Sequence, residues 1–223
     1  MNKIFFYKEW IKTRYYFIIA FIVTLCFCVY CMLNISRVIE LKGAAHIWEV
    51  MLQRDAIFIQ QLRFIPLIIG ILAGVMQFIP EMQQKRIKLT LHLPCSYYRS
   101  IGIMLLFGAC MLILIFACNF LFLSIALSQY FAAEMVRHIL LTALVWYLAG
   151  VLAYFLSAWI CIEPTWKHRV LNTLIAVAVL RIFFLSETPE AYNSFLPILI
   201  VYTVLASVLP FLSVARFKTG KQD

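Results

Sequence analysis

The sequence predicts an all-α integral membrane protein, and three features of its 223 residues support that prediction. Hydrophobic residues make up 65% of the chain and charged residues 13%, against roughly 45–50% and about 25% in soluble domains. The apolar residues gather into six runs, and most cationic residues lie in the segments between them. A fold of this size cannot hide so much apolar surface from water, so lipid is expected to surround it.

Six runs predict six membrane spans, because a helix needs about 20 residues to cross about 30 Å of hydrocarbon. The third run is long enough to tilt, whereas the fifth is short and contains Arg181. Five spans with one re-entrant segment are the main alternative. The predicted spans, all in a single transmembrane domain over residues 1–223, cover about 15–33, 58–79, 101–129, 138–161, 170–186 and 195–215.

The distribution of charge predicts that both termini are cytoplasmic. With six spans, 13 of the 19 Lys and Arg residues fall in the segments on the side of the termini, and six of the ten acids fall on the other side. This is the positive-inside bias of membrane proteins. It explains the net charge of +9 without a nucleic-acid partner, and none is expected.

The N-terminal residues predict a short interfacial helix over 3–14, ahead of a retained first span. The run that follows is longer than the 7–15 apolar residues of a signal peptide. One face of the helix is apolar and the other is charged, the pattern of a helix lying on a membrane surface. The alternative is a disordered basic head. The apolar face holds Ile4, Tyr7, Trp10 and Ile11, and the charged face holds Lys8, Glu9 and Lys12.

The signatures of common enzymes are missing, so the chain is not expected to be an enzyme. It contains no phosphate-binding loop, no His-Glu-x-x-His, no Gly-x-Ser-x-Gly and no pair of acids inside a span. Cys26, Cys28 and Cys31 point in different directions at helical spacing, which favours packing over metal binding. No cofactor or metal is expected on this chain.

A few polar residues within the spans are candidates for a substrate path or outer gate. Gln60 and Arg63 begin the second predicted span, either snorkelling to the interface or facing a vestibule. Asn119 lies well inside the third, where an interhelical hydrogen bond is the simpler interpretation. Arg181 lies about 16 Å into the fifth, where a charge costs about 3 kcal/mol. It either snorkels outward or faces a partner in the bundle.

Two glycines in the second predicted span indicate close helix packing. Gly70 and Gly74 form a Gly-x-x-x-Gly step, which lets another helix approach the backbone. The partner is either another span of this chain or a second copy.

The inward segment over 80–100 is longer than a simple connection requires. Glu81 and Lys85 suit the first turn of a helix. Leu89, Leu91 and Leu93, however, alternate with polar residues at the period of a strand. The pattern alone leaves both interpretations open.

This segment resembles the type-2 ATP-binding-cassette (ABC) permeases. The shared features are the acidic Glu81, the basic Lys85 and Arg86, a Leu-rich run that ends at Pro94, and a polar stretch ending at Arg99. The stretch Tyr7-Lys8-Glu9-Trp10 before the first span resembles the interfacial helix of that family. Six spans with both termini inside also match.

The resemblance implies a permease subunit in a bacterial inner membrane, and we expect it to act in export. The aromatic-rich spans indicate an amphiphilic substrate such as a lipid, peptide or drug. The resemblance implies a second permease copy, identical or not, and two ATPase subunits that bind ATP and Mg²⁺. It also implies short re-entrant helices between the fifth and sixth spans, although 223 residues is small for the family. A non-transporting scaffold or assembly subunit is the alternative, and an intramembrane enzyme the third choice. The expected ATPase-coupling residues in the implied coupling helix are Glu81, Lys85, Arg86, Leu89, Leu91 and Leu93.

Overall fold

The computed structural model describes residues 2–43, 59–83, 97–186, 188 and 190–218. These residues form an all-α fold, as predicted, with no strand among them. Five helical stretches are long and apolar enough to cross a membrane, which makes the chain a multi-pass membrane protein. They are Phe6–Leu41, Gln60–Gln83, Tyr98–Ser128, Ala133–Ile162 and Asn193–Arg216.

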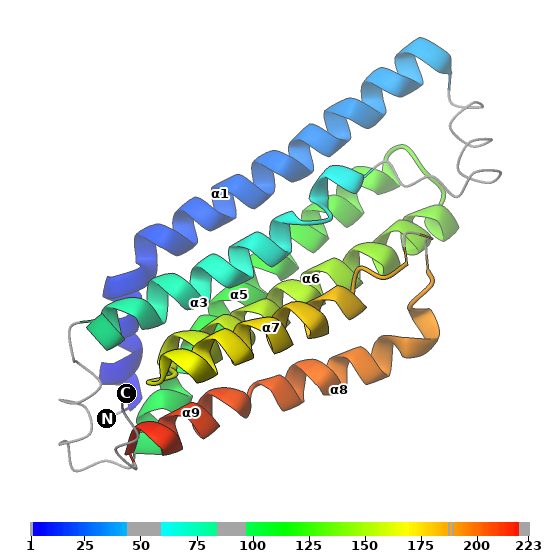
Figure 1. The fold of residues 1–223 in the computed structure, drawn as a ribbon. Coiled ribbons are helices and arrows are strands. Elements are labelled where there is room, and N and C mark those ends of the chain that lie inside the picture. Colours follow the sequence, from blue (N-terminus) through cyan, green and yellow to red (C-terminus); the bar gives the residue numbers. More distant parts are fainter. Residues whose placement is uncertain (1, 44–58, 84–96, 187, 189, 219–223) are drawn as a thin grey trace.

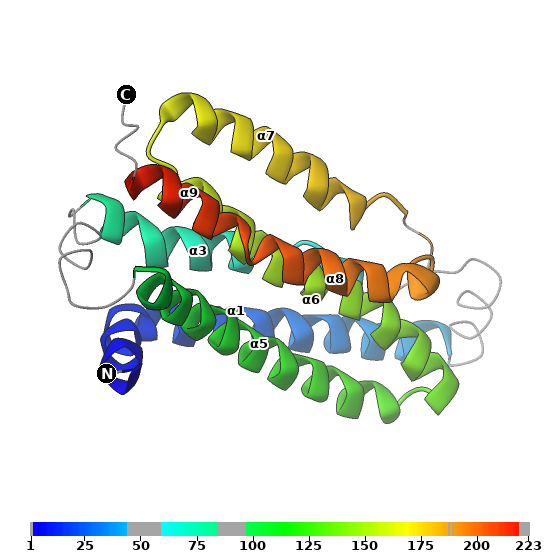
Figure 2. The ribbon, with the colours of Figure 1, turned by 90° about the horizontal axis from the view of Figure 1, so that it is seen from below.

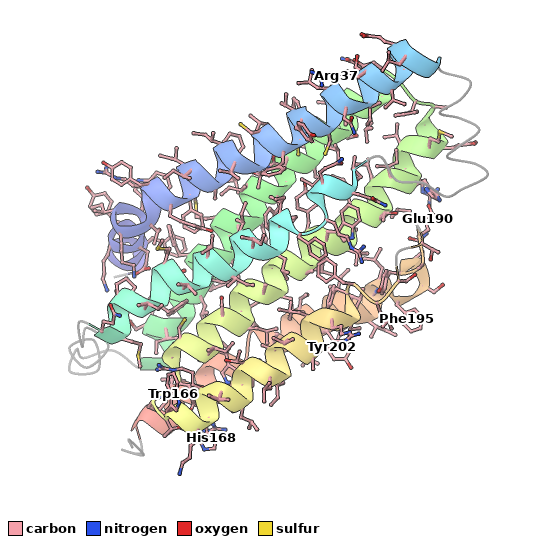
Figure 3. All side chains as sticks on the ribbon, turned by 45° about the horizontal axis from the view of Figure 1, so that its top comes forward. Arg37, Trp166, His168, Glu190, Phe195 and Tyr202 are labelled. Carbon is pink, nitrogen blue, oxygen red and sulfur yellow. The ribbon has the colours of Figure 1, made fainter. Side chains whose placement is uncertain are left out.

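These five stretches and the helix over 166–182 lie side by side in one bundle and alternate in direction along it (Figure 1). Both termini lie at the same end, which we call the terminal end; the opposite end is the far end. Figure 3 shows Trp166 and His168 at the terminal end and Arg37 and Glu190 at the far end. The α-helices are α1 (Asn2–Lys42), α3 (Ile65–Gln83), α5 (Tyr97–Ser128), α6 (Ala133–Ile162), α7 (Trp166–Ile182), α8 (Leu196–Ala206) and α9 (Leu209–Lys218).

Helix α1 joins two elements that were predicted separately. The predicted interfacial helix over 3–14 and the predicted span over 15–33 lie on one helix, because α1 is continuous from Asn2 to Lys42. Its first turns nevertheless bend away from the axis of the rest (Figure 2). No Pro or Gly lies in α1, so nothing in its sequence stops the helix at residue 14.

Helices α3 and α6 form the centre of the bundle, and their contact answers the question left by the Gly-x-x-x-Gly step. A Cβ on Gly70 would lie 1.9 Å from the carbonyl oxygen of Gly150, and a Cβ on Gly74 would lie 2.0 Å from Ser157 Oγ. The partner of the step is therefore α6 of the same chain. Small residues on both helices bring the backbones together.

The sixth predicted span is divided. Helix α8 ends at Ala206 and α9 begins at Leu209, just before Pro210. Proline has no N–H to donate, and its ring clashes with the carbonyl four residues earlier. Ser207 and Val208 make tighter turns instead, donating their N–H groups to Val204 and Leu205.

Helix α7 corresponds to the fifth predicted run. Its 17 residues extend about 26 Å, and it is not among the five candidate spans. The expected re-entrant helices do not form in the described residues between α7 and α8, where the one helical element is the 3₁₀ helix Asn193–Phe195. The run therefore folds as a single helix that packs against α6.

Candidate functional site

A group of charged and polar side chains is buried at the terminal end, where four helices meet. We call it the charge cluster. Carboxylates and ammonium groups are rarely buried without partners, because leaving water costs them several kcal/mol. The charge cluster consists of Lys8, Glu9 and Lys12 of α1, Gln77 and Glu81 of α3, and Tyr154 of α6.

Two lysines and two glutamates form its ionic part. Lys12 Nζ lies 2.9 Å from Glu9 Oε2 and 3.0 Å from Glu81 Oε1. Lys8 Nζ lies 3.1 Å from the same Glu81 oxygen. Both carboxylates are fully buried, whereas the side chain of Lys12 is 14% exposed and that of Lys8 is 36% exposed. The formal charges cancel, so the cluster can be buried as a neutral unit.

Gln77 extends the ionic part into the bundle. Its Nε2 donates to Glu9 Oε2 at 3.0 Å and to the carbonyl oxygen of Met104 at 2.8 Å. Its Oε1 accepts a hydrogen bond from Tyr154 Oη at 2.8 Å. One amide thus connects α1, α3, α5 and α6, and its position one turn before Glu81 puts both side chains on the same face of α3.

Gly108 of α5 leaves the room that this network needs. A Cβ at position 108 would lie 2.2 Å from Tyr154 Oη and 2.3 Å from Gln77 Oε1. Any side chain there would displace the hydrogen bond between them. The side chains of the charge cluster therefore come from α1, α3 and α6, and Gly108 of α5 leaves the space that they occupy.

The structure places the predicted coupling residue Glu81 inside the protein. Helix α3 continues through Pro80 to Gln83, so Glu81 lies on the helix rather than in a loop. Of the described residues, none donates to its Oε2. Glu81 thus ties the last turn of α3 to α1. The other predicted coupling residues, Lys85, Arg86, Leu89, Leu91 and Leu93, lie outside the described residues.

The predicted interfacial residues lie on two different faces of α1, as their pattern indicated. The charged face, however, packs against other helices of the protein. Tyr7 is 67% exposed and Trp10 is 40% exposed, which suits contact with lipid headgroups. Glu9, on the opposite face, is fully buried. Helical periodicity showed which residues share a face; it gave no sign that Glu81, 69 residues after Lys12, would meet the charged one.

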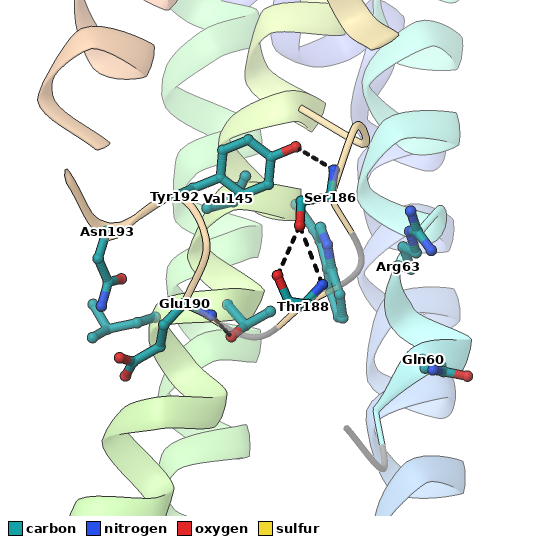
Figure 4. Close-up of a pocket in the computed structure, with 11 residues that line it drawn as sticks. Gln60, Arg63, Val145, Ser186, Thr188, Glu190, Tyr192 and Asn193 are labelled. Atoms are coloured by element: carbon teal, nitrogen blue, oxygen red, sulfur yellow. Dashed lines mark hydrogen bonds between the residues drawn. The ribbon is translucent and has the colours of Figure 1, made fainter. Parts of the chain in front are cut away.

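The candidates for a substrate path do not form a single site. Gln60 and Arg63 line a pocket of about 20 Å³ at the far end, room for about one water molecule. Figure 4 shows this pocket, in which the backbone N–H of Ser186 donates to Tyr192 Oη. Arg63 Nη2 donates to the carbonyl oxygen of Phe184 at 3.3 Å. Arg63 thus connects the start of α3 to the residues that follow α7.

The other two path candidates lie apart from this pocket. Asn119 is fully buried, and its Nδ2 donates to Thr24 Oγ1 at 2.8 Å, joining α5 to α1. Arg181 is exposed in the last turn of α7. Because α7 begins at Trp166, Arg181 lies farther along the helix than the sequence predicted, at an end where a cation is favoured.

A third buried carboxylate at the terminal end, separate from the charge cluster, was not predicted from the sequence. Glu163, just after α6, is fully buried and accepts hydrogen bonds from Ser213 of α9 and from Asn172 of α7 at 3.4 Å. Arg216 Nη1 lies 3.5 Å from both carboxylate oxygens. The signal available was one acid in an otherwise cationic inward segment, directly before Pro164.

Comparison with known proteins adds no relative. The chain matches no protein-family model, no curated protein and no solved structure. The functional inference therefore depends on the charges and contacts of the residues themselves.

Proposed function

We propose that the chain is the six-span permease subunit of an ABC transporter that exports an amphiphile. It works with a second permease copy and two ATPase subunits that bind ATP and Mg²⁺. Helix α7 is the sixth crossing in this proposal, and both termini are cytoplasmic in a bacterial inner membrane. The carrying observation is the charge cluster, which joins the N-terminal turns of α1 to Glu81.

The charge cluster suits a coupling role because of where Glu81 lies. The segment that resembles the coupling helix of type-2 permeases starts at this residue. A push on that segment is delivered first to α3, and the ion pairs of Glu81 with Lys8 and Lys12 pass it to α1. Gln77 passes it on to α5 and α6.

Burial makes this link stiff. A buried ion pair resists separation, because each partner left alone in a low-dielectric interior loses several kcal/mol. The first turns of α1 and the end of α3 are therefore expected to move as one body when ATP binding closes the ATPase dimer. Rocking of the remaining spans would then expose the substrate to the other side.

Co-purification with the ATPase tests the proposal. A tagged copy of the chain is recovered from the membranes of its host cell, and any ATPase with a phosphate loop that co-purifies is identified by mass spectrometry. We expect the ATPase to co-purify and its activity to respond to the permease. Charge reversal of Lys85 and Arg86 to glutamate is expected to abolish that response.

A matched reversal controls for net charge. Lys167 and Lys221 also lie on the predicted inside, and their change to glutamate alters the charge by the same amount; coupling is expected to persist. Recovery of the chain without any ATPase would favour the scaffold, and substrate turnover by the chain alone would favour an intramembrane enzyme. Unchanged coupling in the Lys85 and Arg86 variant would also refute the proposal.

A further inference from the structure

A cleft at the terminal end is separate from the charge cluster and from the pocket at the far end. Its volume is about 470 Å³, within the range of about 300–1,000 Å³ that is usual for small-molecule sites. Most of its wall is apolar. The lining residues are Ile79, Met82 and Gln83 of α3, Ile160 and Cys161 of α6, and Arg169 of α7.

The cleft lies beside the lipid-facing surface of the bundle. Helix α6 packs against both α3 and α7 and lies between them (Figure 1). Exposed apolar side chains such as Leu72 and Met76 precede Ile79 on the outer face of α3. These positions follow one another at helical spacing, so the apolar wall of the cleft continues the surface that lipid tails cover.

Arg169 gives the cleft a positive charge. Its Nη2 donates to the carbonyl oxygen of Glu163 at 2.8 Å, and this hydrogen bond holds the guanidinium near the N-terminus of α7. No carboxylate in the part of the chain that the structure describes forms an ion pair with Arg169. Its side chain lines the cleft, and an anion is the group with which a guanidinium forms strong charge-assisted hydrogen bonds.

The neighbours of Arg169 belong to a membrane interface. Trp166 is 69% exposed, and its ring lies 5.9 Å from the Arg169 guanidinium carbon. Lys167 and His168 are exposed on the same turn. Tryptophan with cationic neighbours is typical of the headgroup level of a bilayer, where basic side chains attract anionic lipids.

We propose that this cleft binds an anionic phospholipid from the leaflet on the terminal side. The phosphate pairs with Arg169, and an acyl chain lies against Ile79, Met82 and Ile160. The apolar wall gives a phospholipid contacts that a free phosphate ion lacks, and the guanidinium favours an anionic headgroup over a zwitterionic one. The inference does not depend on the proposed transport function.

Lipid binding to the purified chain tests this site. Delipidated protein is titrated in detergent with dioleoyl phosphatidylglycerol or with dioleoyl phosphatidylcholine, and native mass spectrometry counts the bound lipids. We expect phosphatidylglycerol to bind roughly tenfold more tightly, about the effect of one charge-assisted contact. Phosphatidylglycerol should also slow alkylation of Cys161 by a maleimide, read at that residue by peptide mass spectrometry.

Variants at Arg169 separate the site from general charge. Arg169→Gln is expected to remove the preference for phosphatidylglycerol and the protection of Cys161, while Arg169→Lys keeps part of both. Arg181→Gln removes the same charge from the far end of α7 and should leave both unchanged. Circular dichroism and gel filtration establish that each variant is folded.

Three results would overturn the proposal. Equal affinity of the wild-type chain for the two lipids would show that charge plays no part. A preference that survives Arg169→Gln would place the lipid elsewhere. Displacement of phosphatidylglycerol by millimolar inorganic phosphate, with equal protection of Cys161, would assign the site to a free anion.

Discussion

Lys12 and Glu81 are 69 residues apart in the sequence, yet Lys12 Nζ lies 3.0 Å from Glu81 Oε1. The carboxylate of Glu81 is fully buried. The pair joins the first helix to the end of the second candidate span. Because Lys8 and Glu9 complete a neutral set of four charges, removing a single charge has a different effect from removing one of each sign.

Removing Glu81 alone should destabilise the fold. Glu81→Gln leaves an excess positive charge at Lys8 and Lys12, with an expected cost of about 3–5 kcal/mol. Adding Lys12→Met restores neutrality with a side chain of similar length and should recover most of that loss. Equilibrium unfolding in SDS measures both. Glu40→Gln, at an exposed site of the same helix α1, is the control and should be silent; an additive double variant would contradict the pairing.

Substitution of Gly108 by alanine should destabilise the fold, whereas the same substitution at Gly102, also on α5, should not. Gly108→Ala puts a methyl group against Tyr154 Oη and Gln77 Oε1, an overpacking that costs about 1–3 kcal/mol. Among the described residues, a Cβ at Gly102 would meet only Phe211, at 3.5 Å, so Gly102→Ala should be neutral or stabilising by up to about 1 kcal/mol. Apparent melting temperatures in detergent compare them, and equal values would refute the tight contact.

Glu163 should hold α9 in place. Glu163→Gln keeps an acceptor for Ser213 but removes the charge that faces Arg216, a loss of about 1–3 kcal/mol. The expected result is faster amide hydrogen exchange over residues 209–216, with α3 unaffected. Glu134→Gln, in the exposed first turn of α6, serves as the matched control. Unchanged exchange in α9 would remove Glu163 from this role.

If the proposed function is correct, the charge cluster matters for coupling beyond stability. The double variant Glu81→Gln with Lys12→Met should fold nearly as stably as the wild type but lose the stimulation of the partner ATPase by the permease. The measurement is ATPase activity of the reconstituted complex against that of the ATPase alone. Full stimulation in a folded double variant would leave the cluster with a structural role only.

A sixth crossing by α7 predicts opposite exposure of its two ends. In a cysteine-free chain, Thr188→Cys should react with a membrane-impermeant maleimide from outside intact cells, and Lys167→Cys only after lysis. Glu134→Cys marks the far end independently. Labelling of positions 167 and 188 from the same side would show that α7 does not cross and would leave the chain with five spans.

Much of the fold was predictable because lipid imposes one length and one composition on every crossing helix. The observed α5 and α6 begin four or five residues before the predicted spans and end within one residue of them. The boundaries of helices inside the predicted segments were not predicted. The predicted boundary near residue 14 falls inside α1, because the end of a charged stretch does not end a helix. The real break before Pro210 has a local steric cause that an apolar run conceals.

The candidate site was predictable only in part. The pattern of Lys8, Glu9 and Lys12 identified a charged helical face, and Glu81 was singled out as the acid after the second predicted span. Their meeting depends on helix packing, which spacing along one helix cannot reveal. Gln77 and Tyr154 went unnoticed, since a single amide or phenol in an apolar run gives no sign of its partner.

The order of synthesis gives the charge cluster a consequence for assembly in the membrane. Lys8, Glu9 and Lys12 leave the ribosome well before Glu81, so α1 enters the bilayer with one more positive than negative charge among these three. The set becomes neutral only when α3 arrives beside it. In a chain whose α3 is inserted wrongly, Lys12 lacks the carboxylate of Glu81 as its partner. Neutralisation of this set of four charges therefore accompanies the correct pairing of the first two crossings.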